Sequence, residues 1–289
     1  MSKKLLLNKG SYNYFVFKVS AGKTIELIDD SYNSITDWGD GSSNTKTYHT
    51  YKNGGIYTVM TQHRINYVEL RNGYNDYTVG ALIECLGVKK NIDLRRMFDG
   101  CANLTKADIS SIDSSPRNLN STFSGCQNLE TIIYPEQINI IGMRRAFNDC
   151  KKLESINTSC FNALHTDDFD VVEAFSDCSS LTSLDFSWIS GALDRITDLS
   201  YMFSGCKSLT SLDLRPMDTC RAVYFSYMFM GCESLTFLDI NGWIMRDWLD
   251  EYATKGMFTG CKNLTLGGIH MTNCYYNVKE YITAAINNK

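Results

Sequence analysis

Several features that would assign a protein to a common class are scarce or missing here. The 289 residues include only 3 prolines, which argues against collagen-like or proline-rich linker segments. No apolar run reaches the roughly 18 residues that a membrane-spanning helix needs. The first ten residues, MSKKLLLNKG, hold three consecutive leucines, far fewer than the roughly 7 to 15 apolar residues of a signal peptide. We therefore expect no membrane insertion and no export signal in this chain.

Strong net charge and familiar catalytic motifs are missing as well. With 28 basic and 32 acidic residues the net charge is −4, so nothing electrostatic favours nucleic acid or an anionic membrane as partner. The patterns G-x-x-x-x-G-K-[ST], G-x-S-x-G and H-E-x-x-H do not occur, and no cysteines are spaced Cys-x-x-Cys. Metal-ligand spacing is also lacking among the histidines, which are His49, His63, His165 and His270. We predict no enzyme, no catalytic residues, no cofactor, no metal site and no nucleic acid partner.

Cysteine, by contrast, is abundant, and most of it belongs to a repeated phrase. Of the 11 cysteines, seven end a four-residue phrase that begins with phenylalanine and has Gly or Asp in third place. The phrase recurs every 24 to 29 residues, and its phenylalanines are Phe98, Phe123, Phe147, Phe175, Phe203, Phe229 and Phe258. An internal repeat of this length predicts a solenoid in which each coil stacks on the next.

The repeated cysteines have three interpretations. Because a thiol is small and tolerates burial, we predict a reduced, buried ladder of cysteines beside stacked phenylalanine rings. Disulfide pairing and metal binding are the alternatives, although an odd number of cysteines cannot all pair. The four cysteines outside the phrase are less constrained, and Cys220 and Cys274 lie near turns where one could be exposed.

Each phrase is followed by the pattern L-x-x-L-x-L, which is clearest from Leu181, Leu209 and Leu235. Its last apolar pair alternates with period two, which predicts a short strand, and stacked copies would form a parallel sheet with strands about 4.8 Å apart. In the other half of each repeat, apolar residues recur near every third position, as in Ile196 and Leu199. That spacing predicts short helical or 3₁₀ turns on the outer face.

The ends of the chain differ from the repeats. Residues 275–289 carry apolar side chains at helical spacing, which predicts a capping helix over the last coil. Strand-like segments dominate residues 1–64, which we predict to be a small all-β domain. The solenoid is then expected over 65–274, with about seven to eight turns and a degenerate first turn between about 65 and 97.

The phrases AFNDCKKLESI (146–156) and MFSGCKSLTSLDLRPMDT (202–219) resemble BspA-like leucine-rich repeats, the Treponema-type class of bacterial and some protist surface proteins. The resemblance spans about residues 90 to 272. It implies a leucine-rich-repeat solenoid with a parallel β-sheet on the concave face and helical turns on the convex face. The family is associated with adhesion and with binding of matrix or host proteins, and its repeats share no catalytic residues.

A second resemblance lies in DWGDG (37–41), HTY (49–51) and GIYTV (55–59). These segments are similar to the polycystic-kidney-disease (PKD) domain, an immunoglobulin-like β-sandwich of extracellular and surface proteins. The segments FVFKV, KTIELI and IYTVMT independently predict strands, and Asp-Gly and Asn-Gly-Gly predict tight turns. An oxygen-rich calcium site is an alternative for Asp29, Asp30, Asp37 and Asp40, although turn chemistry accounts for the last two without a metal.

The outward-facing strand positions form the candidate binding strip. Their second column is acidic or amide in five of seven repeats, and in the last repeat we expect Leu266 and Gly268 to point outward. Stacked carboxylates repel one another and favour hydroxyl neighbours, cations or a basic partner, but Asp could equally cap the strand-to-turn transition. The exposed aromatic Phe237 favours binding. The predicted partner-binding residues are Asp108, Asn157, Ser183, Asp185, Ser211, Asp213, Phe237 and Asp239.

Together these features predict a non-enzymatic recognition or adhesion protein, extracellular or at a cell surface, whose concave face binds a protein or glycan. The N-terminal domain would serve as attachment or spacer. The alternative is a bacteriophage virion component, such as a tail or capsid decoration, bound to other virion subunits. It is motivated by surface-type modules without an export signal, since lysis would release such a protein.

Overall fold

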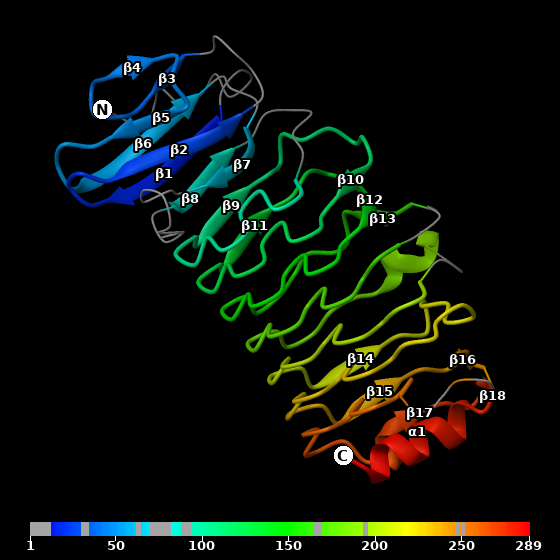
Figure 1. Cartoon of the computed structure of the whole chain (residues 1–289). Helices are drawn as coiled ribbons and strands as arrows, with labels where there is room; N and C mark the ends of the chain where they lie inside the picture. The colour runs from blue at the N-terminus through cyan, green and yellow to red at the C-terminus, as the bar shows by residue number, and fades with distance from the viewer. Residues whose placement is uncertain are drawn as a thin grey trace.

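A computed structural model of the chain describes residues 13–29, 35–61, 65–69, 82–87, 94–164, 169–192, 196–246, 249 and 252–289. The molecule is elongated: an N-terminal β unit leads into a stack of coils, and a helix closes the far end (Figure 1). One core of buried side chains runs from the β unit through the coils to that helix.

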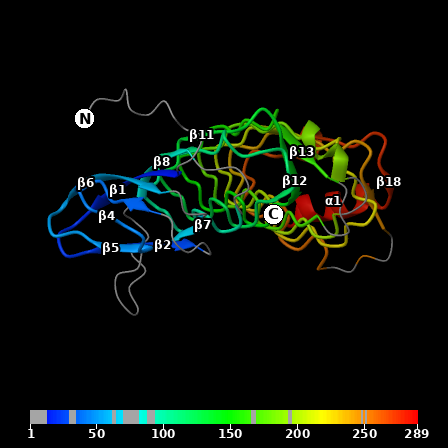
Figure 2. The same cartoon turned by 90° about the horizontal axis from the view of Figure 1, so that it is seen from above.

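Two antiparallel sheets make up the N-terminal β unit, and Figure 2 shows them as separate layers. One sheet has the order β8-β1-β6-β3-β4, with bounds Leu82–Gly87, Asn13–Val19, Gly55–Thr61, Thr36–Asp37 and Ser43–Asn44. The other has the order β5-β2-β7, with bounds Tyr48–Thr50, Thr24–Asp29 and Ile65–Glu69. Alternation along β1 buries Phe15, Phe17 and Val19, and β2 buries Ile25 and Leu27, because one face of each strand is apolar. The immunoglobulin-like identity of this unit stays a prediction.

Strand β8 joins the β unit to the coils. It pairs antiparallel with β1 and parallel with β9 (Lys106–Asp108), where Cys85 lies opposite Ala107. Strands β7 and β8 both follow residue 64, so the pairing of the N-terminal sheets continues past the boundary that we expected there. The first coil therefore starts against a paired strand, and β8 covers the edge of β9 at this end.

The strand face of the solenoid is the row of segments that follow the Phe-Cys phrases. Its strands are parallel, namely β9, β11 (Thr131–Ile133), β14 (Ser211–Asp213), β15 (Phe237–Asp239) and β17 (Ile269–His270). Their pairing confirms the parallel strands that we expected at these places. At 155–157 and 183–185 the chain is not a strand; there Thr158 Oγ1 donates to Asp185 O at 3.0 Å.

Further short strands pair on another side of the coils. One parallel sheet joins β10 (Arg117–Asn118), β12 (Ile138–Gly142) and β13 (Phe161–Ala163), and a second joins β16 (Ile244–Met245) and β18 (Tyr275–Tyr276). Two 3₁₀ helices are present in the described part of the chain, η2 (Ser187–Ala192) and η3 (Leu266–Gly268). Each coil is thus held to its neighbours on more than one side.

The expected helical turns of the outer face are not confirmed, because successive tight turns take their place. The peptide N–H of Phe203 donates to Met228 O of the next coil at 2.9 Å, whereas that of Met202 donates within the coil, to Leu199 O at 3.3 Å. Left-handed residues two before and two after the phenylalanine, Tyr201 (φ 57°) and Gly205 (φ 74°), produce this alternation. A continuous helix would direct every N–H within its own coil.

The Phe-Cys phrases form a continuous column inside these turns. Consecutive phenylalanine rings, from Phe98 to Phe258, stack with centroids 5.4 to 5.7 Å apart and planes within 15°. Six of the thiols donate to the carbonyl oxygen of the phenylalanine one coil earlier, at 3.0 to 3.2 Å. The seven corners delimit six full turns, against the seven to eight expected for the whole solenoid.

All 11 cysteines are free thiols in this structure. The predicted ladder is present, since every cysteine of the repeated phrase is buried, while Cys220 and Cys274 are half-buried. Burial raises the pKa of Cys101, Cys150 and Cys206 far above the value of a free thiol. These three side chains fill the column as small, uncharged groups.

Helix α1 (Val278–Asn287) covers the last coil, as its spacing predicted. It buries Val278, Ile282, Ala285 and Ile286, and Tyr281 donates its hydroxyl to Leu249 O at 2.9 Å. This apolar face replaces the next coil that the solenoid would otherwise need. None of the helices in the described residues combines the length and hydropathy required to cross a membrane.

Candidate binding surface

The eight residues predicted to bind a partner lie on the strand face, but they differ in exposure. Asp108 and Asp239 are each only 7% exposed. The others are exposed, and these are Asn157, Ser183, Asp185, Ser211, Asp213 and Phe237. Strand pairing sets Ser211 beside Phe237 and Asp213 beside Asp239, whereas Asp108 lies at the other end of the solenoid in β9, next to the β unit.

The acidic or amide column has the same structural role in all five coils. Each side chain accepts the peptide N–H two residues further on, at 2.9 to 3.2 Å, in an Asx turn. The five acceptors are Asp108, Asn157, Asp185, Asp213 and Asp239. Capping of the strand-to-turn transition therefore explains why this residue type recurs, and any binding role depends on the oxygen atoms that remain.

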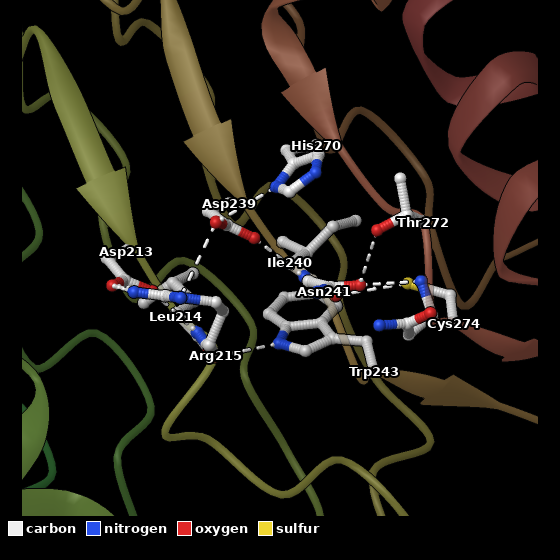
Figure 3. Close-up of polar contacts among 11 residues, drawn as sticks. Asp213, Leu214, Arg215, Asp239, Ile240, Asn241, Trp243, His270, Thr272 and Cys274 are labelled. Carbon is white, nitrogen blue, oxygen red and sulfur yellow. Dashed lines mark hydrogen bonds and ion pairs between the residues drawn. The ribbon is translucent and has the colours of Figure 1, made fainter.

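At the C-terminal end of the strand face, the carboxylates of Asp213 and Asp239 form a charged network with neighbouring side chains (Figure 3). Arg215 holds Asp213 bidentately, with Nε 2.9 Å from Oδ1 and Nη2 2.6 Å from Oδ2. Its Nε also lies 3.4 Å from Asp239 Oδ2, and His270 Nδ1 lies 3.1 Å from the same oxygen. Hydrogen bonds from Arg215 lower the pKa of Asp213, so this carboxylate is ionised at neutral pH.

Hydrogen bonds behind the network fix the loops that carry it (Figure 3). Trp243 Nε1 donates to Leu214 O at 3.1 Å, and the thiol of Cys274 donates to Ile240 O at 3.1 Å. Asn241 Oδ1 accepts the peptide N–H of Asn273 at 2.6 Å and the hydroxyl of Thr272 at 3.2 Å. The loops after β14, β15 and β17 are thus joined, which makes this end of the strand face a preorganised surface.

Our expectation for the last coil was wrong in its register. We expected Leu266 and Gly268 to point outward from a strand, but both belong to η3, and β17 begins only at Ile269. Leu238 pairs with Ile269, and His270 lies beside Asp239. A side chain at Gly268 would meet Thr236 O at 2.2 Å, so glycine is required at this close approach.

Phe237 is the exposed aromatic side chain of this surface. It is 46% exposed, and strand pairing sets Ser211 of β14 beside it. A half-exposed aromatic ring on a fixed strand is typical of an interface anchor.

Sequence reasoning missed Arg215 and His270, which complete the network. A usable signal existed for Arg215, since the position two residues after each column residue is also outward by strand alternation and holds Ser110, Ser159, Ser187, Arg215 and Asn241. His270 had no such signal, because its place beside Asp239 depends on the shift in the last coil.

In the β unit, the segments that resemble a PKD domain form a cluster of rings and turns. His49 stacks on Trp38 (5.3 Å between centroids) and meets Tyr51 edge-on (4.6 Å), while the Tyr51 hydroxyl donates to Trp38 O at 2.9 Å. Asp37 accepts the Gly39 N–H at 2.9 Å, and Asp40 lies 2.7 Å from His49 Nε2. The motif thereby ties two turns to a buried aromatic core.

The calcium alternative gains no support from these contacts. Asp37 and Asp40 each close a turn, and no group of three or more His, Cys, Asp or Glu side chains within the described residues is placed to hold a metal ion. Asp30 and the side chain of Asp29 lie outside what the structure describes. Turn chemistry is sufficient for both aspartates that can be placed.

Asp40 should make the β unit sensitive to acid. Burial raises the pKa of this carboxyl, but hydrogen bonds from Ser42 and the contact with His49 outweigh that effect and lower its pKa from 3.8 to about 2. Because the folded-state pKa is below the unfolded one, the stabilisation is complete above pH 3.8 and is lost as the pH falls towards 2. Urea titrations across this range should show a steeper loss of unfolding free energy in the wild type than in Asp40→Asn. Parallel pH profiles would contradict the assignment.

Comparison with known families supports the assignment of the repeat region. Residues 91–169 match the family described as BspA type Leucine rich repeat region (6 copies). Residues 143–270 match a second family, described as Mycoplasma protein of unknown function, DUF285. Both matches begin after residue 90, so the resemblance of the β unit to a PKD domain stays a prediction. No curated protein and no solved structure matches the chain.

Proposed function

We propose that this chain, whose repeat region is of the BspA leucine-rich-repeat type, is a non-enzymatic recognition protein that binds a macromolecular partner through its strand face. The observation that carries the proposal is the combination of half-exposed Phe237 with the fixed charged network of Asp213, Arg215 and Asp239. Recognition surfaces combine an apolar anchor with surrounding polar groups, and both lie here on adjacent strands.

The organisation of the coils supports this role. Stability resides in the buried phenylalanine and cysteine column, whereas the outward strand positions contribute little to the core. Outward residues that do not cap a turn, such as Ser211 and Phe237, can vary without disturbing the fold, which suits a surface that adapts to a partner. The N-terminal β unit, paired to the first coil through β8, would then act as attachment or spacer.

The wider setting of the function is also a proposal. BspA-type repeats are usual in surface-exposed proteins, which favours an extracellular or cell-surface location and a protein or glycan as partner. Neither the fold nor the comparisons favour the virion alternative.

A variant of the strand face tests the proposed function. The combination Asp185→Lys, Asp213→Lys and Phe237→Ala should weaken binding to any partner found on arrays of matrix proteins and glycans by at least about tenfold, since anchors and their charged neighbours dominate interfaces. Asp239 is left unchanged because it is almost fully buried. The protein should stay folded with thermal unfolding lowered by roughly 4–8 °C, because the altered positions are exposed but each aspartate reversal removes an Asx-turn acceptor worth about 1 kcal/mol.

The matched control carries charge reversals beside the Phe-Cys corners, away from the strand face, at Asp99 and Glu233 (both to Lys). This control changes the net charge in the same direction and by the same amount as the two aspartate reversals. It should leave array binding intact. Equal losses in both variants, or no loss in the strand-face variant, would reject the strand face as the binding surface.

A further inference from the structure

We infer that the C-terminal half of the strand face docks a basic segment of a partner protein, with an apolar side chain of that segment packed on Phe237. This inference rests on the proposed function and adds the chemistry of the partner to it. We call the surface concerned the docking face. It is formed by segment 183–185, β14, β15 and β17, together with the residue two positions after each of Asp185, Asp213 and Asp239.

Charge is the first argument. The docking face carries two exposed carboxylates, Asp185 and Asp213, and the nearly buried Asp239 against one guanidinium, Arg215, a formal net charge of −2 when only Asp, Glu, Lys and Arg are counted. Its remaining outward positions are serine, threonine, asparagine and glycine. An acidic face repels phosphate, sulfate and carboxylate ligands and attracts lysine and arginine, so charge complementarity selects a cationic partner.

Phe237 supplies the second argument. Its ring is 46% exposed, two residues before Asp239 on β15, and strand pairing sets the small side chain of Ser211 beside it. Binding by charge alone does not explain an exposed phenylalanine, because contact of the ring with water is unfavourable. An apolar group next to basic residues would satisfy both features, which points to a protein segment rather than to a free cation.

Arg215 supplies the third argument, since its guanidinium makes the same kind of ion pair with the docking face that we propose for an arginine of the partner. Its guanidinium bridges Asp213 and Asp239, yet 57% of the side chain is exposed. The two carboxylates therefore lie at a spacing that accepts a guanidinium, and exposed ion pairs of this kind exchange readily because they contribute little free energy. A partner arginine would compete with Arg215 for the exposed oxygen atoms of Asp213.

That competition gives a result of predictable sign. Removing the internal guanidinium frees the exposed carboxylate of Asp213, while Asp239 keeps its contact with His270, so Arg215→Ala should strengthen the binding of a basic segment. A surface that recognised an acidic partner would instead lose its cation and bind more weakly.

The probes are three fluorescein-labelled hexapeptides with the sequences GRLWRG, GQLWQG and GELWEG, titrated with the full chain and followed by fluorescence anisotropy at low and high salt. The arginine peptide should bind at least about fivefold more tightly than the glutamine peptide, and the glutamate peptide should not bind. Arg215→Ala should tighten binding of the arginine peptide by about two- to fivefold. Asp185→Asn with Asp213→Asn should weaken it by about fivefold or more, and Phe237→Ala by a similar factor. The control pair Asp99→Asn and Glu233→Gln, which removes the same number of charges elsewhere, should have no effect.

Two outcomes overturn the inference: weaker binding of the arginine peptide to Arg215→Ala, or binding of the glutamate or glutamine peptide as tight as that of the arginine peptide. The array experiment tests the proposed function independently of the peptide titrations. If the strand-face variant loses an array partner that is a glycan or an acidic protein, the proposed function stands and the basic docking segment is rejected. If that variant keeps every array partner, the proposed function itself fails.

Discussion

Replacing Phe175 with alanine is expected to lower the free energy of unfolding by about 3–5 kcal/mol, the usual cost of removing a fully buried phenylalanine. Phe175 lies in the middle of the column, 5.6 Å from Phe147 and 5.7 Å from Phe203 in nearly parallel stacks. Phe186 also packs edge-on against it at 6.0 Å. Truncation would leave a cavity bordered by three aromatic rings that the hydrogen-bonded turns prevent from closing.

The effect should also be visible in the shape of the transition. Each coil contacts only its neighbours, so a defect in the middle uncouples the two halves of the solenoid. Urea denaturation followed by circular dichroism should show a broader transition, or two transitions, in Phe175→Ala. The matched control is Phe237→Ala, which removes the same atoms from a ring that is 46% exposed and should change the free energy of unfolding by less than about 1 kcal/mol. Similar losses in both variants would show that the column does not carry the stability assigned to it.

The column itself was predictable from the sequence, because phenylalanine and cysteine recur at a fixed offset that only stacked coils explain. The geometry of the turns around it was not. Apolar residues spaced by about three fit both a helix and a series of tight turns. The left-handed residues that distinguish the two cannot all be recognised from their residue type. Two residues after the phenylalanine the chain offers Gly or Asp, which tolerate this conformation, but two residues before it stand Arg145, Glu173 and Tyr201, all with φ between 53° and 57°. Inter-coil hydrogen bonds impose that conformation against local preference.

The candidate surface was predictable in part for a similar reason. Alternation placed Asp185, Asp213 and Phe237 on the outward side, and the structure exposes all three. The same alternation could not reveal that Asp239 is nearly buried by Arg215 and His270, since this depends on which residues the next coil brings alongside. In the last coil, η3 takes up the residues that precede β17 and displaces the register that the pattern indicated.

The double pairing of β8 is another tertiary effect. Residues 82–87 bury Leu82, Cys85 and Gly87 rather than every second residue, in line with the irregular pairing of β8 with β1. Nothing in the sequence of this segment distinguishes an antiparallel partner from a parallel one. The structure uses both edges, with β1 on one side and β9 on the other. A strand with both edges paired couples the β unit to the solenoid, so damage in one should be felt in the other.

Two neighbouring glycines of the β unit allow that unit to be perturbed with a close control. Gly39 (φ 78°) and Gly41 (φ 90°) both have left-handed backbones, which cost a non-glycine residue about 1–2 kcal/mol. Their surroundings differ. A Cβ atom at Gly39 would lie 2.5 Å from Thr58 O and 3.0 Å from Thr58 N, both backbone atoms of β6, whereas a Cβ atom at Gly41 would meet nothing within 4 Å.

Gly39→Ala should therefore lower the free energy of unfolding of the β unit by about 3–5 kcal/mol, because it adds a backbone clash to the conformational penalty. Gly41→Ala should cost only the penalty of about 1–2 kcal/mol. The clash cannot be relieved by a side-chain movement, since Thr58 lies in β6 opposite Val16 of β1. Hydrogen exchange should accelerate in β1 and β6 of Gly39→Ala, and through β8 it should extend to β9, but it should leave β14 and β15 unchanged. Equal destabilisation by the two alanines would mean that β6 yields to the added methyl group, and protection of β9 in Gly39→Ala would mean that the β unit and the solenoid unfold independently.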